Sequence, residues 1–405
     1  MFSTQIFHHN HRIFPKDLKN LFVAKLFRSI GLQFSTFFMP LFLYQLGVKF
    51  HPFDISPFQN GMILLGMYFI FERISVFFFT IPTSKIIAKI GIRNSLIMSQ
   101  VLYVIILALY VLAQHRPVYF LLILIIEGIR IPLFWCSYYS LFSSNALYKR
   151  MGESVGTLEF FTRLLQAAIP AISGLIIVQL SFSYIFYVSL FFQALSIVML
   201  LLVKEQTKVS DPSLIELKVW LKEPQFRLLT FSQIGKYAAD AMQGLWPLFV
   251  LILIGTADKV GYLYFVVFFV TLLLSYFAGW YVDHFKNRRP FAITGSILSS
   301  LWIMRFYITS IWSIMAVDIF GSLADSIYSP FYDSILLRRG KGQSSFSYFV
   351  YHEMIMGFSG IIFWGIFILY FVFTDSWRNF ILLGFIAPLM SMQLRDKSVK
   401  IVEKE

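Results

Sequence analysis

The residues of this chain most able to do chemistry are charged side chains that lie inside long apolar stretches. An ionised side chain in hydrocarbon is costly, so such residues usually pair with one another or face a water-filled cavity where ions bind or move. Acids and bases are nearly balanced in these stretches, which favours ion pairs around a wet pathway over isolated charges. The bases are Lys25, Arg28, Arg73, Arg130, Arg163, Lys236 and Arg305, and the acids are Glu72, Glu127, Glu159, Asp240, Asp318, Asp325, Asp333 and Glu353.

Two acid–base pairs are spaced so that they can neutralise each other on one helix face. Glu127 precedes Arg130 by three residues, and Lys236 precedes Asp240 by four, the spacings at which helical side chains meet. For both pairs, structural pairing and a direct role in transport stay open, and the two are compatible if the pair breaks during transport. Glu72 and Arg73 are adjacent, should point apart, and should need separate partners on other helices.

Two further carboxylates, Glu159 and Glu353, are candidates for carrying a proton. A medium of low dielectric constant disfavours the ionised form of a carboxyl group and so raises its affinity for protons. His352 is next to Glu353 but cannot share its helical face, and we interpret it as a packing residue.

Other polar and aromatic residues in these stretches have more local interpretations. Arg305 and Asp318 are expected to form a peripheral clasp, while Lys25 and Asp333 fall near the ends of their stretches and are expected to extend to lipid headgroups. Several large aromatic residues accompany the charges and are candidates for stacking on a solute: Trp135, Tyr138, Tyr139, Trp246, Tyr328 and Tyr332.

The elements that must position these residues are membrane-spanning helices. With 58% hydrophobic and only 14% charged residues, a soluble globule would have an insoluble surface. A spanning helix needs about 20 apolar residues, whereas a barrel strand would show alternation over about ten. The stretches predicted to span are 21–47, 58–83, 94–114, 117–142, 156–179, 182–203, 229–254, 260–282, 290–309, 311–336, 346–373 and 377–393.

The remaining Lys and Arg residues indicate the orientation of the chain. They concentrate on alternate connections, and the other connections hold only Lys49, Arg116, Lys259 and Arg378. Because basic loops stay in the cytoplasm, both termini are predicted to be cytoplasmic in the cell membrane. The net charge of +13 is then a sign of topology, and nucleic acid is not an expected partner because the bases form no single patch.

The chain also repeats itself, which predicts two six-helix halves. The tripeptide at 40–42 returns at 247–249, and Glu159 in the fifth stretch corresponds to Glu353 in the eleventh. Such parallel repeats are one known construction of secondary transporters. The predicted organisation is a cytoplasmic tail at 1–20, bundles at 21–203 and 228–394, a linker with a short amphipathic helix at 204–227, and a tail at 395–405.

Loop residues after the second and eighth stretches resemble the signature of the major facilitator superfamily. The second copy holds Gly279, Asp283, Arg288 and Arg289 at the family's spacing, whereas the first keeps Gly91 and Arg93 but has serine and alanine in place of the first glycine and the acid. The resemblance implies an all-α fold of about twelve spanning helices in two pseudo-symmetric bundles. It also implies a gating role for these loop residues.

In this family the first, fourth, seventh and tenth helices line a central cavity. The resemblance therefore implies that the pathway for substrate and ions includes six residues on those helices: Arg28, Glu127, Arg130, Lys236, Asp240 and Asp325. In the fifth stretch, Pro170 and Gly174 match part of an antiporter motif whose flanking glycines are missing, so antiport is not established.

Other chemistries fit the sequence poorly. There is no phosphate-binding GxxxxGK[ST] loop, the single Cys136 excludes a multi-cysteine metal site, and neither a cofactor nor a metal is expected. The sequence predicts a monomeric secondary transporter of a small organic solute, coupled to an ion such as the proton. The alternatives are a non-transporting protein of the same fold and a membrane-embedded enzyme, which would group its polar residues at one face.

Overall fold

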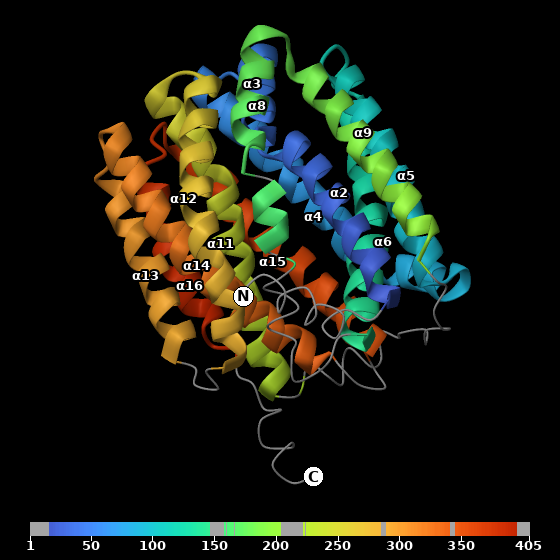
Figure 1. Ribbon diagram of the computed structural model, residues 1–405. Coiled ribbons are helices and arrows are strands. Elements are labelled where there is room, and N and C mark those ends of the chain that lie inside the picture. Colours follow the sequence, from blue (N-terminus) through green and yellow to red (C-terminus); the bar gives the residue numbers. More distant parts are fainter. Residues whose placement is uncertain are drawn as a thin grey trace.

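The protein is almost entirely helical in the part described by its computed structural model, which covers residues 16–145, 158, 160–165, 167–203, 222, 224–284, 289–340 and 345–394 (Figure 1). Nine stretches of these residues are long and apolar enough to cross a membrane. The helices form two six-helix bundles, as the repeat predicted. Residues 1–15, 204–221, 223 and 395–405 lie outside the described residues, so most of the predicted N-terminal tail and of the linker, with its amphipathic helix, and all of the C-terminal tail are not described.

The first bundle follows the predicted stretches in order. Its first span is α2 (Lys16–Thr36) followed by α3 (Met39–Phe50). Next come α4 (Pro57–Ile90), α5 (Ile92–Ala113) and α6 (Tyr119–Asn145). The fifth span is Phe160–Gln179, of which α8 (Ile169–Gln179) is the second part, and α9 (Phe182–Leu201) ends the bundle.

The second bundle begins with α11 (Pro224–Ile254) and α12 (Ala257–His284). The next three helices are α13 (Arg289–Phe306), α14 (Ile311–Arg339) and α15 (Ser345–Phe373). The last span is a short 3-10 turn, η2 (Asn379–Leu382), that continues into α16 (Leu383–Ser391).

The first span differs from the continuous helix predicted at 21–47. It breaks after Thr36, and the second piece starts at Met39 with Pro40 in its first turn. Proline has no N–H to donate and is tolerated best where helical N–H groups have no partner, so the break falls just before it. Within α4, α6, α11 and α14, by contrast, a proline is accommodated without ending the helix.

Two crossings join the bundles. The most extensive runs between α4 and α15, and the second runs between α8 and α12. The start of α2 and the end of α16 lie at the same end of the bundles, which we call the terminal side (Figure 1). The other end is called the opposite side. Backbones approach very closely at the second crossing, on the opposite side, where Gly174 faces Ala257 and Gly261 faces Pro170.

Contacts between the bundles are also present on the terminal side. Ser143 Oγ at the end of α6 donates to the carbonyl oxygen of Leu337 on α14 at 3.1 Å. Nearer the middle, the rings of Tyr139 on α6 and Phe349 on α15 stack with centroids 5.5 Å apart. The bundles therefore touch on both sides of the mid-depth region, where the polar side chains gather.

Candidate functional site

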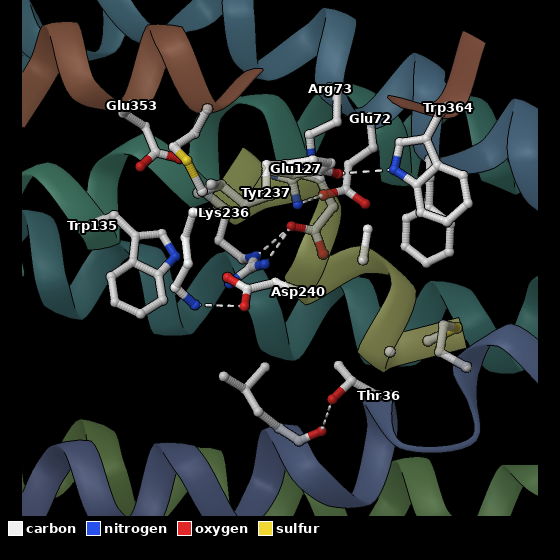
Figure 2. Close-up of a pocket in the computed structure, with 18 of the residues that line it drawn as sticks. Thr36, Glu72, Arg73, Glu127, Trp135, Lys236, Tyr237, Asp240, Glu353 and Trp364 are labelled. Carbon is white, nitrogen blue, oxygen red and sulfur yellow. Dashed lines mark hydrogen bonds and ion pairs between the residues drawn. The ribbon is translucent and has the colours of Figure 1, made fainter. Parts of the chain in front are cut away.

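A cavity of about 580 Å³ lies between the two bundles at mid-depth. Residues of α2 to α6 line one wall, and residues of α11, α14 and α15 line the other. Figure 2 shows side chains from both walls, including Trp135 and Glu353, converging on this space. Its charged lining residues are Arg28, Glu72, Arg73, Glu127, Arg130, Lys236, Asp240, Asp333 and Glu353.

On the first wall, Glu127 and Arg130 form the ion pair that their spacing predicts. Glu127 Oε2 accepts a hydrogen bond from Arg130 Nε at 2.6 Å and lies 2.5 Å from Arg130 Nη2 in the ion pair, and both residues are buried. The guanidinium also lies 4.6 Å from the ring of Tyr103 on α5. One turn of α6 places both groups on the cavity face, and these two contacts hold the arginine in one orientation.

The prediction for Glu72 and Arg73 was wrong. Instead of finding separate partners, the two neighbours on α4 pair with each other, with Arg73 Nη2 donating to Glu72 Oε1 at 2.8 Å. The arginine side chain is long enough to bend around the helix to its neighbour. Its guanidinium lies 5.2 Å from the ring of Tyr237 on α11, and its buried Nε has no hydrogen-bond acceptor among the described residues. Arg73 is thus only partly satisfied and faces the second bundle.

On the second wall, Lys236 and Asp240 of α11 pair as predicted. Lys236 Nζ donates to Asp240 Oδ1 at 2.5 Å, and the ammonium lies 5.7 Å from the ring of Tyr332 on α14 (Figure 2). The Asp240 side chain is 56% exposed, whereas that of Lys236 is only 11% exposed. Asp240 is therefore the member of the pair that water or a solute can reach.

Arg28 on α2 stands apart from these pairs. It lines the cavity, is 3% exposed, and has neither a hydrogen bond nor an ion pair from its guanidinium to any described residue. The guanidinium carbon lies 3.4 Å from the ring centroid of Phe134 and 5.4 Å from that of Trp135. Lys25, one turn earlier, was expected at the headgroups but lies 4.7 Å from the Trp135 ring, because α6 offers an aromatic surface closer than the lipid.

Two of the remaining acids, Glu353 on α15 and Asp333 on α14, line the cavity wall of the second bundle. Glu353 on α15 is buried at 4% exposure, and no hydrogen bond or ion pair joins it to the described part of the chain. Asp333 on α14 was expected at the headgroups but also lines the cavity and has contacts of its own. Asp333 lines the cavity because its side chain faces α11 and does not extend past the end of α14.

Neutral polar atoms on the same wall are available to a solute or to water. His352 packs edge-on against Tyr139, as a packing residue would, yet it also lines the cavity, and its Nδ1 has no hydrogen-bond partner among the described residues. Both amide atoms of the fully buried Gln233 on α11 are likewise unpaired within that part of the chain. The sequence gives no signal for Gln233, since a lone amide in an apolar stretch has no distinctive spacing.

Asp325 takes a different position from the one the resemblance implied. It is absent from the described cavity lining and instead bridges the bundles, accepting from Arg163 Nη2 of the fifth span at 2.7 Å. Arg163 also donates to Ser326 at 2.9 Å, and Ser329 donates to Asp325 at 2.6 Å. The pair joins residues 162 apart in sequence, so no local spacing could have indicated it.

Arg305 and Asp318 pair as expected, but the clasp is fully buried rather than peripheral. Arg305 Nη2 donates to Asp318 Oδ1 at 2.8 Å, and Trp246 Nε1 donates to both carboxylate oxygens at 2.9 Å. The guanidinium carbon of Arg305 also lies 4.1 Å from the ring centroid of Trp302. Trp246 is thereby engaged away from the cavity, and so is Tyr328, whose hydroxyl hydrogen-bonds Ser391. Of the predicted stacking residues, Trp135, Tyr139 and Tyr332 line the cavity.

The junction of α4 and α5 holds Gly91 and Arg93 of the first loop motif. Gly91 ends α4 with φ of 86°, a conformation that strongly favours glycine. Arg93 Nη2 then donates to the carbonyl oxygen of Leu201 at 2.6 Å, at the end of α9, where the helix dipole favours a cation. In the second loop Arg289 starts α13 and is exposed. Arg288, the side chains at Gly279 and Asp283, and the proton candidate Glu159 lie outside the described residues.

Taken with its position between two packed bundles, the cavity defines the class of the protein: a polytopic membrane protein with a charge-lined cavity at the seam of its two halves. A profile of the Major Facilitator Superfamily matches residues 21–256, more than half of the chain. The protein belongs to this superfamily, and its fold and the resemblance seen in its loops are confirmed. No curated protein sequence matches the chain.

Solved structures with the same fold include three that cover nearly the whole chain. The outward conformation of the transporter FucP aligns over 93% of this chain and 96% of its own, with 14% identity and a TM-score of 0.64. A variant of the same protein, the E. coli fucose:proton symporter, aligns over 93% and 97%, with 15% identity and a TM-score of 0.64. The human organic anion transporter MFSD10 aligns over 92% and 100%, with 12% identity and a TM-score of 0.65. At these identities the likeness concerns the fold.

Proposed function

We propose that this protein is a proton-coupled secondary transporter that moves a small organic solute by alternating access of the two bundles. The observation that carries the proposal is Glu353, a buried carboxyl group in the cavity wall with no partner among the described residues. An unpaired ionised carboxylate is costly at such a site, whereas its protonated form is not. Glu353 is therefore suited to take up and release a proton as water enters and leaves the cavity.

Arg73 is the group that we expect to respond when Glu353 loses its proton. The stem of Arg73 packs against Gly360 of α15, whose backbone leaves no room for a side chain there. Glu353 and Gly360 are seven residues apart, so they lie on one face of α15 about two turns from each other. An ionised Glu353 would compete with Glu72 for Arg73 and its unpaired Nε. Arg73 would then move from Glu72 to Glu353 and form an ion pair between α4 and α15. These two helices already make the most extensive contact between the bundles.

The size of the cavity and its chemistry support a small organic solute. A volume of about 580 Å³ falls within the roughly 300–1,000 Å³ that is usual for small-molecule sites. Aromatic faces and unpaired neutral atoms surround the ion pairs, so a solute could replace water without leaving charges unpaired. Among proteins with the same fold, FucP is described as a fucose:proton symporter, which is consistent with proton coupling.

The orientation that we propose places the terminal side in the cytoplasm of a cell. Its support is the concentration of Lys and Arg on the connections of that side, with Lys49, Arg116, Lys259 and Arg378 alone on the other connections. We propose the same division into tails, two bundles and a linker at 204–227 that the repeat predicts, and a monomer as the transporting unit.

Uptake and efflux in proteoliposomes with an imposed pH gradient test the function. We expect the wild-type protein to accumulate at least one solute from a panel of chemical classes when a gradient is imposed. Glu353→Gln should retain solute exchange between equal concentrations but lose accumulation driven by the gradient. Asp375→Asn is the matched control, because this exposed carboxylate binds Ser56 outside the cavity.

Two results would contradict the proposal. Undiminished gradient-driven accumulation by Glu353→Gln would remove this residue from the coupling step. Absence of flux for every solute class, in protein that is folded and correctly inserted, would favour the non-transporting alternative.

A further inference from the structure

We propose that the cavity recognises a small organic anion through a carboxylate group that binds Arg28. The inference rests on the proposed transport function and names the class of its solute. It starts from the pairing of the basic groups in the cavity wall. Arg73 pairs with Glu72 at 2.8 Å, Arg130 with Glu127 at 2.5 Å and Lys236 with Asp240 at 2.5 Å, so three bases each have a carboxylate.

Arg28 is the lining base that has none among the described residues. It is as deeply buried as the paired bases, with 3% of its surface exposed. Glu127 is the carboxylate that acts on it from α6, but the hydrogen bond and the ion pair described for Glu127 both go to Arg130, which itself repels Arg28. A buried guanidinium without a counter-ion is costly, and no described residue supplies one to Arg28, so an anionic solute would fit there.

The surroundings of Arg28 fix its orientation for a planar acceptor. Its guanidinium stacks on Phe134 at 3.4 Å, which holds the plane of the group while leaving its N–H donors at the edge. Trp135 lies 5.4 Å away and lines the same cavity. Guanidinium N–H pairs match the two oxygens of a carboxylate, and an aromatic wall beside them suits an apolar solute body.

The pairing of charges in the cavity is compatible with one negative charge on the solute. The three ion pairs are neutral, which leaves Arg28, Asp333 and Glu353 among the charged lining residues. Asp333 has contacts of its own, and Arg28 and Glu353 lie on opposite walls. A monocarboxylate on Arg28 and a proton on Glu353 would leave each of these two groups neutral. Symport of one monoanion with one proton would then carry no net charge across the membrane.

Equilibrium binding by the full-length chain in detergent at pH 7 tests the inference without any gradient. The probes are matched pairs that differ in charge alone, benzoate with benzamide and hexanoate with hexanamide, together with the cation phenethylammonium. Binding is measured as the concentration-dependent rise in the thermal unfolding midpoint. We expect at least one carboxylate to bind, its amide to bind roughly 10- to 100-fold more weakly, and the cation to give no shift.

Two variants assign the effect to Arg28. Arg28→Gln should lower carboxylate affinity by about 10- to 100-fold, and Arg28→Lys, which keeps the charge but loses the planar fork, should lower it by less. Arg378→Gln is the matched control, because Arg378 also stacks on an aromatic ring, that of Trp377 at 5.9 Å, but is exposed outside the cavity. If Arg28→Gln does not fold, Arg28→Lys carries the test.

The inference is overturned if amides bind as tightly as carboxylates, if the cation binds instead, if no carboxylate binds, or if affinity is unchanged in the folded Arg28 variants. Each of these outcomes leaves the proposed function intact. A neutral or cationic solute that accumulates under a pH gradient in a Glu353-dependent manner would show coupled transport without anion recognition.

Discussion

Replacement of Gly261 by alanine should prevent the two bundles from closing fully on the opposite side. A methyl group added at Gly261 on α12 would lie 2.3 Å from the carbonyl oxygen of Pro170 on α8, whereas ordinary contacts of this kind begin at 3.4 Å. The difference, 3.4 minus 2.3, requires α8 and α12 to separate by about 1.1 Å. A methyl group at Gly174 would likewise lie 2.5 Å from the Ala257 carbonyl oxygen, so the same separation would loosen a second close approach of these helices.

The energetic cost applies only to conformations in which α8 and α12 touch. Overpacking a tight contact costs about 1–3 kcal/mol. The better helix propensity of alanine, roughly 1 kcal/mol relative to glycine, acts equally on closed and open conformations and does not alter their ratio. A cost of about 2 kcal/mol would shift the ratio of closed to open conformations roughly 30-fold towards opening on the opposite side.

Distance measurements between spin labels provide the assay. Labels at His115→Cys and Thr309→Cys, in connections of the first and second bundle on the opposite side, report the gap there in a Cys136→Ala background. Gly261→Ala should move the distribution to longer distances. Gly244→Ala is the control, because a methyl group at Gly244 on α11 meets nothing within 4 Å. It should leave the distances unchanged.

An unchanged distance distribution in Gly261→Ala, with unchanged thermal stability, would refute the reasoning. It would mean that the helices slide past the added methyl group without opening, so that the close approach of α8 and α12 does not control access.

Three further predictions concern single contacts. Asp318→Asn should destabilise the protein by about 3–5 kcal/mol in denaturant titrations, because it leaves Arg305 buried without its counter-ion; a loss below 1 kcal/mol, like that expected of Asp375→Asn, would contradict it. Ser143→Ala should weaken closure on the terminal side by about 0.5–1 kcal/mol, because it removes the hydrogen bond to Leu337. The expected result is faster chemical labelling of a cysteine placed on the terminal side. Ser300→Ala is the control, because the Ser300 hydroxyl binds only its own helix. Gly91→Ala should cost about 1–3 kcal/mol in thermal unfolding, and an unchanged midpoint would exclude backbone strain.

Interactions within a single helix were predictable from the sequence. The pairs Glu127 with Arg130 and Lys236 with Asp240 form because helical periodicity alone brings residues three or four apart together. The exception, Glu72 with Arg73, arose because a flexible arginine can reach an immediate neighbour when no better acceptor faces it. Side-chain length, which periodicity ignores, decided that case.

Interactions between helices were not predictable in the same way. Arg163 and Asp325 are 162 residues apart, and only the packing of the fifth span against α14 brings them together. The aromatic surface of α6 that holds Lys25 and Arg28 likewise exists only once α2 packs beside it.

The sequence by itself determined that this protein crosses the membrane many times, repeats a six-helix unit, and carries a nearly balanced set of acids and bases within its helices. Hydropathy and charge are properties of each residue and its near neighbours, so they can be read along one dimension. The tertiary structure decided which charges are neutralised and which are not. Within the described part of the chain, Arg28 and Glu353 have no ion-pair partner, because partner choice depends on distances between helices, and those are set by packing in three dimensions.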